Sequence, residues 1–104
     1  IDIQRRTFAV ANRTGGFSGP AIKPIAVRMV YQVAQAVQIP IVGMGGISCW
    51  EDAIEFLLAG ATMVSVGTAN FYNPNVTMEV VDGIEKYLLD HQISDVRELI
   101  GAVK

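Results

Sequence analysis

The sequence predicts an α/β fold with parallel strands, namely the C-terminal part of a (β/α)8 TIM barrel, with about strands 7 and 8 and their helices. Residues 39–46 (IPIVGMGG) and 62–68 (TMVSVGT) are each mainly apolar with glycine at or next to the end, and a helical pattern follows each run. Continuous apolar runs are typical of parallel strands that are covered on both faces. The loops after the last two strands of such barrels commonly form a phosphate site.

The length of the chain limits how much of this barrel it can contain. A (β/α)8 barrel has about 250 residues, whereas this chain has 104. We therefore expect a fragment, in which residues 1–104 are the C-terminal part of one domain. Hydrophobic residues make up 51% and charged residues 17% of the chain, against about 25% charged residues in an average globular domain. That composition fits elements that are buried on several sides.

The net charge and the lack of targeting signals exclude several classes of function. The formal net charge is −2, and the eight basic residues form no stripe that would follow a nucleic-acid backbone. The sequence contains one cysteine, no signal-peptide pattern and no apolar run long enough to cross a membrane. We expect a cytoplasmic protein that binds neither nucleic acid nor a membrane.

The elements of the first half follow from residue type and spacing. β-branched and aromatic residues predict a short strand within residues 6–12. A glycine-rich loop over residues 14–20 leads into a helix from about residue 21 to residue 37, and Pro24 fits only the first turn of that helix. Apolar residues at helical spacing predict that one side of this helix packs on a sheet. A strand over residues 41–44 comes next.

The second half repeats the order of strand, glycine turn and helix. Ser48 and Glu51 have the spacing of a capping box. The elements predicted after this box are a helix over residues 50–59 that Gly60 closes, a strand over 62–66, a short helical turn at 69–72, a helix over 76–90 and an amphipathic segment over 95–103. The β-α-β-α order with short connections predicts parallel strands with right-handed crossovers.

Glycines at the ends of the two strands are the best candidates for a binding site. A phosphate needs several convergent N–H donors, and neighbouring parallel strands would bring Gly45, Gly46, Gly67 and Thr68 together. The dipoles of the helices that follow would add positive charge, and Gly19 could supply a third backbone face. One such turn is more often only a tight connection, but two in succession favour a phosphate site.

The other polar residues favour structural roles. We expect Cys49 to be a thiol packed at a helix start, because no histidine or other activating group lies near it in the sequence. His91 suits the end of a helix at the surface, and Lys23 is a surface lysine, although it follows the glycine loop. The sequence contains no cluster of metal ligands and no paired acid and base, so we expect no catalytic residue in this chain. The carboxylates expected on solvated helix faces are Asp52, Glu55, Glu79, Asp82 and Glu85.

Three motifs carry a resemblance to a known family. Residues 14–24 (TGGFSGPAIKP), 41–47 (IVGMGGI) and 66–71 (VGTANF) resemble the C-terminal third of dihydroorotate dehydrogenase, and the likeness covers nearly the whole chain. The GMGG and GTANF motifs are most similar to class 1B, the NAD-linked form.

The resemblance implies an FMN-dependent barrel that oxidises (S)-dihydroorotate to orotate in pyrimidine (UMP) biosynthesis. Gly19, Gly45, Gly46, Gly67 and Thr68 would then bind FMN, mostly at its phosphate. The cysteine base of the family belongs to a loop far upstream, and Cys49 does not match it. Class 1B also implies an oligomer with an electron-transfer subunit that carries FAD and a [2Fe–2S] cluster and reduces NAD. This chain has no set of cysteines for such a cluster.

Two other interpretations remain open at the level of sequence. The chain could come from another FMN-dependent barrel oxidoreductase, such as a dihydropyrimidine dehydrogenase. It could also be a non-catalytic fragment that binds only phosphate. The residues before Ile1 would separate the two enzymes, and a flavin spectrum would separate either enzyme from the fragment.

Overall fold

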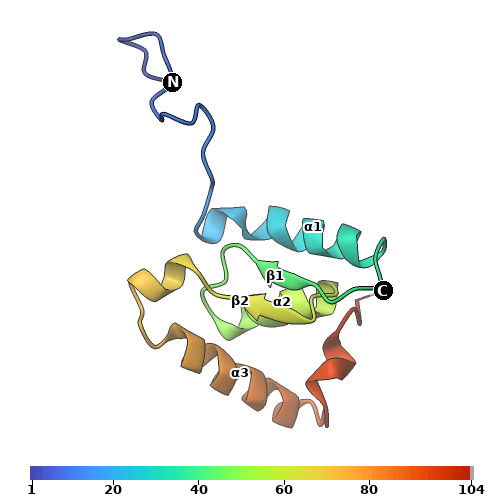
Figure 1. Ribbon diagram of the computed structural model, residues 1–104. Coiled ribbons are helices and arrows are strands. Elements are labelled where there is room, and N and C mark those ends of the chain that lie inside the picture. The colour runs from blue at the N-terminus through green and yellow to red at the C-terminus, as the bar shows by residue number, and fades with distance from the viewer. Residues whose placement is uncertain (104) are drawn as a thin grey trace.

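The computed structural model describes residues 1–103, and its helices and strands follow the predicted order (Figure 1). The strands are β1 (Val42–Met44) and β2 (Met63–Ser65), and the α-helices are α1 (Lys23–Ala34), α2 (Trp50–Ala59) and α3 (Val76–Asp90). Short 3-10 helices cover Pro20–Ile22, Thr68–Phe71 and Val96–Leu99. The predicted bounds of α2 and α3 are confirmed, and both strands lie within their predicted ranges.

The two strands are parallel, as predicted, with Val42 opposite Met63 and Gly43 opposite Val64. Helix α2 connects them and lies against one face of the sheet. Gly43 allows this close approach, because a Cβ atom at Gly43 would lie 2.7 Å from Cδ1 of Phe56. The Phe56 side chain is fully buried in the core between α2 and the sheet.

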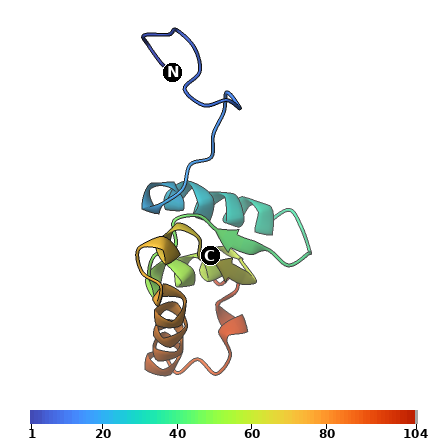
Figure 2. The same ribbon diagram turned by 60° about the vertical axis from the view of Figure 1, so that its left-hand side comes forward.

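Helix α2 is the centre of the helical layer, with α1 and α3 in contact with it on either side (Figures 1 and 2). Gly60 ends α2 in the left-handed conformation, at φ +116°, as its position after the helix predicts. On the other side, Gly83 of α3 lies directly against the indole of Trp50. Small residues at these points let the helices approach closely.

The opposite face of the sheet is open, which corrects the expectation that both faces are covered. Val42, Met44 and Met63 point to this face and are 44%, 59% and 54% exposed. The reason is topological: within residues 1–103 all three α-helices lie on the other side of the strands or along their flank. The apolar runs identified the strands correctly but overstated their burial.

The predicted strand within residues 6–12 is wrong. The segment that contains residues 6–12 extends away from the helices and the sheet (Figure 1), and Phe8 and Val10 are about half exposed. A strand needs a hydrogen-bonding partner along its length, and the described part of this segment makes only an isolated bridge between Asp2 and Thr7. The radius of gyration is therefore 16.5 Å, against about 13 Å for a compact domain of this length.

Two helix boundaries also differ from the predictions. The first helix is divided into a 3-10 turn and α1, which begins at Lys23 with Pro24 in its first turn. It ends at Ala34, three residues before the predicted end. The last segment contains only the 3-10 turn Val96–Leu99, whose buried Leu99 packs against α2. No helix among residues 1–103 has the length and hydropathy needed to cross a bilayer.

Candidate functional site

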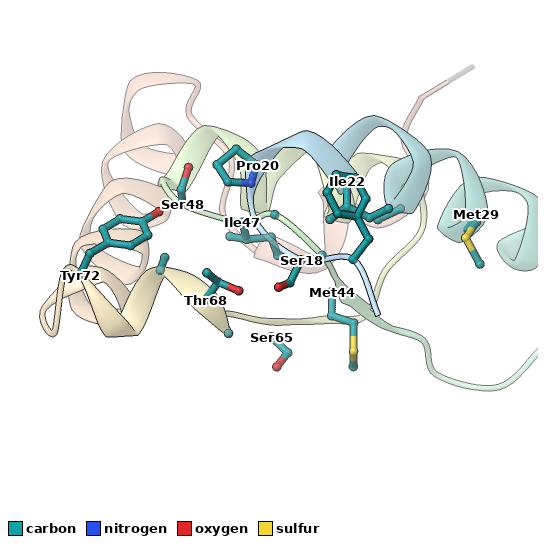
Figure 3. A pocket seen from close by; sticks show the side chains of 17 residues that line it. Ser18, Pro20, Ile22, Met29, Met44, Ile47, Ser48, Ser65, Thr68 and Tyr72 are labelled. Atoms are coloured by element: carbon teal, nitrogen blue, oxygen red, sulfur yellow. The ribbon is translucent and has the colours of Figure 1, made fainter. Parts of the chain in front are cut away.

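A pocket of about 390 Å³ lies where the two parallel strands end. Three segments form its walls: the loop before α1, the loop between β1 and α2, and the chain after β2 (Figure 3). We call it the glycine pocket, and its glycines are Gly19, Gly45, Gly46 and Gly67. A concave site at the carboxyl ends of parallel strands is the usual place for a ligand in α/β folds.

All five residues predicted to bind the phosphate line this pocket: Gly19, Gly45, Gly46, Gly67 and Thr68. Their backbone N–H groups donate to no acceptor among residues 1–103. Free N–H groups from three separate loops in one concave site are what an anion requires.

Two of the glycines cannot be replaced without distortion. Gly45 has φ +120° and Gly46 has φ +78°, a region that other residues rarely adopt. A Cβ atom at Gly46 would lie 2.8 Å from the carbonyl oxygen of Gly19 and 3.0 Å from the backbone nitrogen of Lys23. At Gly45 it would lie 2.9 Å from Cβ of Ala26. The glycines therefore let the β1 loop lie directly on the start of α1.

The rest of the pocket combines hydroxyl groups with apolar side chains. Ser18, Ser65 and Thr68 supply hydroxyl groups, and Figure 3 shows Ser18 and Thr68 at the pocket from the loop before α1 and the chain after β2. Ile22 of the 3-10 helix before α1, Met29 of α1 and Met44 of β1 add apolar surface. This lining suits a ligand with an anionic end and an apolar body. Of these residues Thr68 is predicted from the sequence, and Ser18, Ile22 and Met44 lie within the three sequence motifs but have no role assigned there. Ser65 and Met29 lie outside these motifs, so no local signal indicates them.

Asp52 does not lie on a solvated helix face, which corrects the prediction. Asp52 is only 6% exposed. One carboxylate oxygen accepts hydrogen bonds from the backbone N–H and the hydroxyl of Ser48, at 2.8 and 2.9 Å, and from the N–H of Cys49 at 3.2 Å. The capping box is thus one residue later than predicted, with Cys49 as the N-cap and Asp52 in place of Glu51. The N–H groups of Ser48 and Cys49 before α2 therefore donate to this carboxylate and not to an external ligand.

Lys23 is the partner of Asp52 on α1. Its Nζ atom lies 2.6 Å from Oδ1 of Asp52 and 2.9 Å from Oε1 of Glu55. Burial alone would raise the pKa of Asp52, but the hydrogen bonds from Lys23, Ser48 and Cys49 outweigh burial and hold that pKa at about 2. The hydrogen bonds to Asp52 and Glu55 raise the pKa of Lys23. The expectation that Lys23 is only a surface lysine is therefore wrong.

The remaining candidates lie where the sequence predicts. Cys49 is half-buried at the start of α2, and burial raises the pKa of its thiol, which disfavours the reactive thiolate. His91 follows α3, and its ring stacks on Tyr87 with centroids 4.0 Å apart. Neither residue lines the glycine pocket. Glu55, Glu79, Asp82 and Glu85 are exposed, as predicted. In residues 1–103 no three His, Cys, Asp or Glu side chains are grouped as a metal site would need.

Comparisons with known proteins all lead to the same family. The family model described as dihydroorotate dehydrogenase matches residues 1–88. The chain is 66% identical over 104 residues to the "Dihydroorotate dehydrogenase B (NAD(+)), catalytic subunit" of Lachnoclostridium phytofermentans, and 64% identical over 101 residues to that of Alkaliphilus oremlandii. These matches cover 100% and 97% of the chain but 35% and 33% of the relatives. The chain thus spans about a third of the length of the curated relatives that it matches.

A solved structure shows the same arrangement of helices and strands. The crystal structure of DHODH from Eimeria tenella in complex with ferulenol superposes with a TM-score of 0.79 at 29% sequence identity. The match covers 90% of this chain and 26% of the Eimeria chain. The fold of most of this chain therefore also occurs as part of a larger protein.

Proposed function

The chain belongs to the dihydroorotate dehydrogenase family, and from this premise we propose that it forms the C-terminal third of the catalytic subunit of an NAD-linked, class 1B dihydroorotate dehydrogenase. We call that whole protein the parent subunit. Support comes from the relatives that bear this description, which are 55–66% identical to the chain and about three times its length. The open face of the sheet agrees with this proposal, because the other strands of a (β/α)8 barrel would cover Val42, Met44 and Met63.

The proposed reaction is the FMN-dependent oxidation of (S)-dihydroorotate to orotate in pyrimidine biosynthesis. When bound, FMN supplies the hydride acceptor for this oxidation. The part of this chain in the reaction is to hold the phosphate end of FMN. Gly19, Gly45, Gly46, Gly67 and Thr68 would donate their N–H groups to the phosphate oxygens.

The glycine pocket fits this cofactor on three grounds. Its N–H donors have no acceptor within residues 1–103. A Cβ atom at Gly45 or Gly46 would meet the start of α1, so the loop can hold this form only with glycine. The volume of about 390 Å³ is within the range of about 300–1,000 Å³ of ligand pockets. The free N–H groups of the five predicted residues are the observation that carries the proposal.

The proton acceptor for dihydroorotate would come from another part of the parent subunit. Cys49 and His91 lie outside the pocket, and Asp52, whose carboxylate holds the end of the pocket loop, is paired with Lys23. In this proposal the described residues hold the phosphate end of the cofactor, and a group elsewhere in the parent subunit accepts the proton. The transfer of electrons to NAD would use a partner subunit with FAD and a [2Fe–2S] cluster, and we place the assembly, an oligomer, in the cytoplasm.

The visible absorption spectrum of the purified parent subunit tests this function first. We expect flavin bands, release of FMN on denaturation, and bleaching of the bands by dihydroorotate in the absence of oxygen. NAD reduction should require the electron-transfer subunit. A parent subunit that is folded but colourless, and stays colourless after incubation with FMN, would refute the proposal. A flavoprotein that dihydropyrimidines other than dihydroorotate reduce would instead support the other barrel oxidoreductase.

A further inference from the structure

We propose that Asp52 is a positioning residue for the glycine pocket: with Lys23 it holds the loop between β1 and α2 in the form that presents the N–H groups of Gly45 and Gly46 to a phosphate. This inference rests on the proposed function, because it concerns the same phosphate site. The residue touches no ligand and acts through the backbone of the loop.

The first step is that the Asp52 carboxylate joins two elements that are far apart in the sequence. Its Oδ2 atom accepts three hydrogen bonds from Ser48 and Cys49, at the end of the pocket loop. Its Oδ1 atom accepts one from Nζ of Lys23, at the first residue of α1. The Asp52 side chain is 9% exposed and that of Lys23 is 24% exposed, so water screens this pair less than it screens a surface pair.

The second step is that the pocket loop leaves little freedom between its fixed points. Ser48 lies two residues after Gly46, and the residue between them, Ile47, is buried in the core and 3% exposed. On the other side, the backbone nitrogen and Cβ of Lys23 would both lie 3.0 Å from a Cβ atom at Gly46. Lys23 therefore supports the loop at two points: its backbone lies against Gly46, and its ammonium group bonds Asp52, which holds the end of the loop at Ser48 and Cys49.

The third step is that neither charge can serve as the ligand itself. Asp52 and Lys23 are absent from the lining of the glycine pocket. A carboxylate would repel a phosphate, and the Lys23 ammonium is already shared between Asp52 and Glu55. The charge of a bound phosphate would thus be met by backbone N–H groups, whose direction depends on the conformation that Asp52 maintains.

The test compares FMN with riboflavin, which has the same ring system but no phosphate, on the apo form of the parent subunit. Asp52→Asn keeps the shape of the side chain, but its NH2 group cannot accept a hydrogen bond, so bonds from Ser48 or Lys23 are lost. We expect the Kd of FMN to rise about tenfold, which corresponds to about 1.4 kcal/mol, while the Kd of riboflavin and the kcat per bound flavin stay unchanged. Glu55→Gln is the matched control, because it removes a charge next to Lys23 and leaves all four bonds of Asp52 in place.

Each result separates the possible roles of Asp52. Equal weakening of FMN and riboflavin, or a lower melting temperature with wild-type FMN affinity, would overturn the positioning role and indicate a purely structural one. If Asp52→Asn does not fold, Lys23→Gln gives the second reading: it breaks the pair at its more exposed end, and we expect weaker FMN binding with unchanged riboflavin binding. FMN affinity unchanged in Lys23→Gln would then overturn the inference. A wild-type parent subunit that binds no FMN would refute the proposed function instead.

Discussion

Replacing Gly46 with alanine should damage the glycine pocket more than replacing Gly19 or Gly16. At φ +78° an alanine is strained, and the left-handed conformation costs roughly 1–2 kcal/mol for a residue with a Cβ atom. The added atom would also lie 2.8 Å from the Gly19 carbonyl oxygen and 3.0 Å from the Lys23 backbone. Because both neighbours are backbone atoms, they cannot rotate away, and overpacking of this kind costs about 1–3 kcal/mol.

The backbone strain and the overpacking add to at least about 2 kcal/mol. This free energy can appear in either of two measurements. Either the loop keeps its form, and the free energy of unfolding falls by that amount. Or the loop relaxes, the N–H groups of residues 45 and 46 turn away, and the Kd of FMN rises about 30-fold. Urea unfolding of the apo parent subunit and a flavin fluorescence titration measure the two effects, and we expect their sum to reach about 2 kcal/mol.

Two glycines of the loop before α1 provide graded controls. Gly19→Ala has the strain of φ +96° but no atom within 4 Å of the new Cβ, so its effect should be intermediate. Gly16→Ala has neither strain nor contact and should behave as wild type. The reasoning is refuted if Gly46→Ala keeps wild-type stability and FMN affinity, or if Gly16→Ala loses as much as Gly46→Ala.

Three further predictions concern the elements behind the pocket. The pKa of Asp52 is held at about 2, below its ordinary value of 3.8, so its pairing stabilises the parent subunit by about 2 kcal/mol above about pH 4. This contribution is lost as the pH falls from about 4 toward 2. A plot of unfolding free energy against pH should therefore be flatter between about pH 4 and pH 2 for Asp52→Asn than for the wild type. Gly83→Ala would bring a Cβ atom within 2.2 Å of Cγ of Trp50, so thermal unfolding should show a clearly lower melting temperature, and the second substitution Trp50→Ala should recover part of it; no recovery would mean that the indole is not the obstacle. Cys49 should react with iodoacetamide at pH 8 much more slowly than a free thiol, because burial raises its pKa; a rate equal to that in urea would show that the thiol is not protected.

The parts of the fold that the sequence predicts are those with local signals. The bounds of α2 and α3 follow from apolar periodicity and from residues that begin and end helices, and Gly60 marks the end of α2 with its left-handed conformation. Gly45, Gly46 and Gly67 of the pocket could be named because a glycine at the end of a parallel strand is itself a local signal. Thr68 and Gly19 could be named from their places next to Gly67 and in the glycine-rich loop before α1. Their role toward FMN stays a prediction.

The parts that the sequence does not predict depend on contacts between distant residues. Lys23 and Asp52 are 29 positions apart, and no periodicity indicates that the first turn of α1 would face the start of α2. The segment 6–12 has the composition of a strand, but composition does not supply a partner for its backbone. The capping box was shifted by one residue because Ser48–Glu51 and Cys49–Asp52 have the same spacing, and only burial of the carboxylate distinguishes them.

The sheet has only two strands, and this has a consequence for how the chain behaves on its own. Within residues 1–103, β1 and β2 pair only with each other, so each strand has an outer edge of unpaired N–H and C=O groups next to exposed Val42, Met44 and Met63. Such edges pair readily with other chains, and a two-stranded sheet is marginally stable by itself. Strands from the rest of the parent subunit would therefore act as a binding partner that covers these edges. Their local concentration would set both the solubility and the stability of this chain.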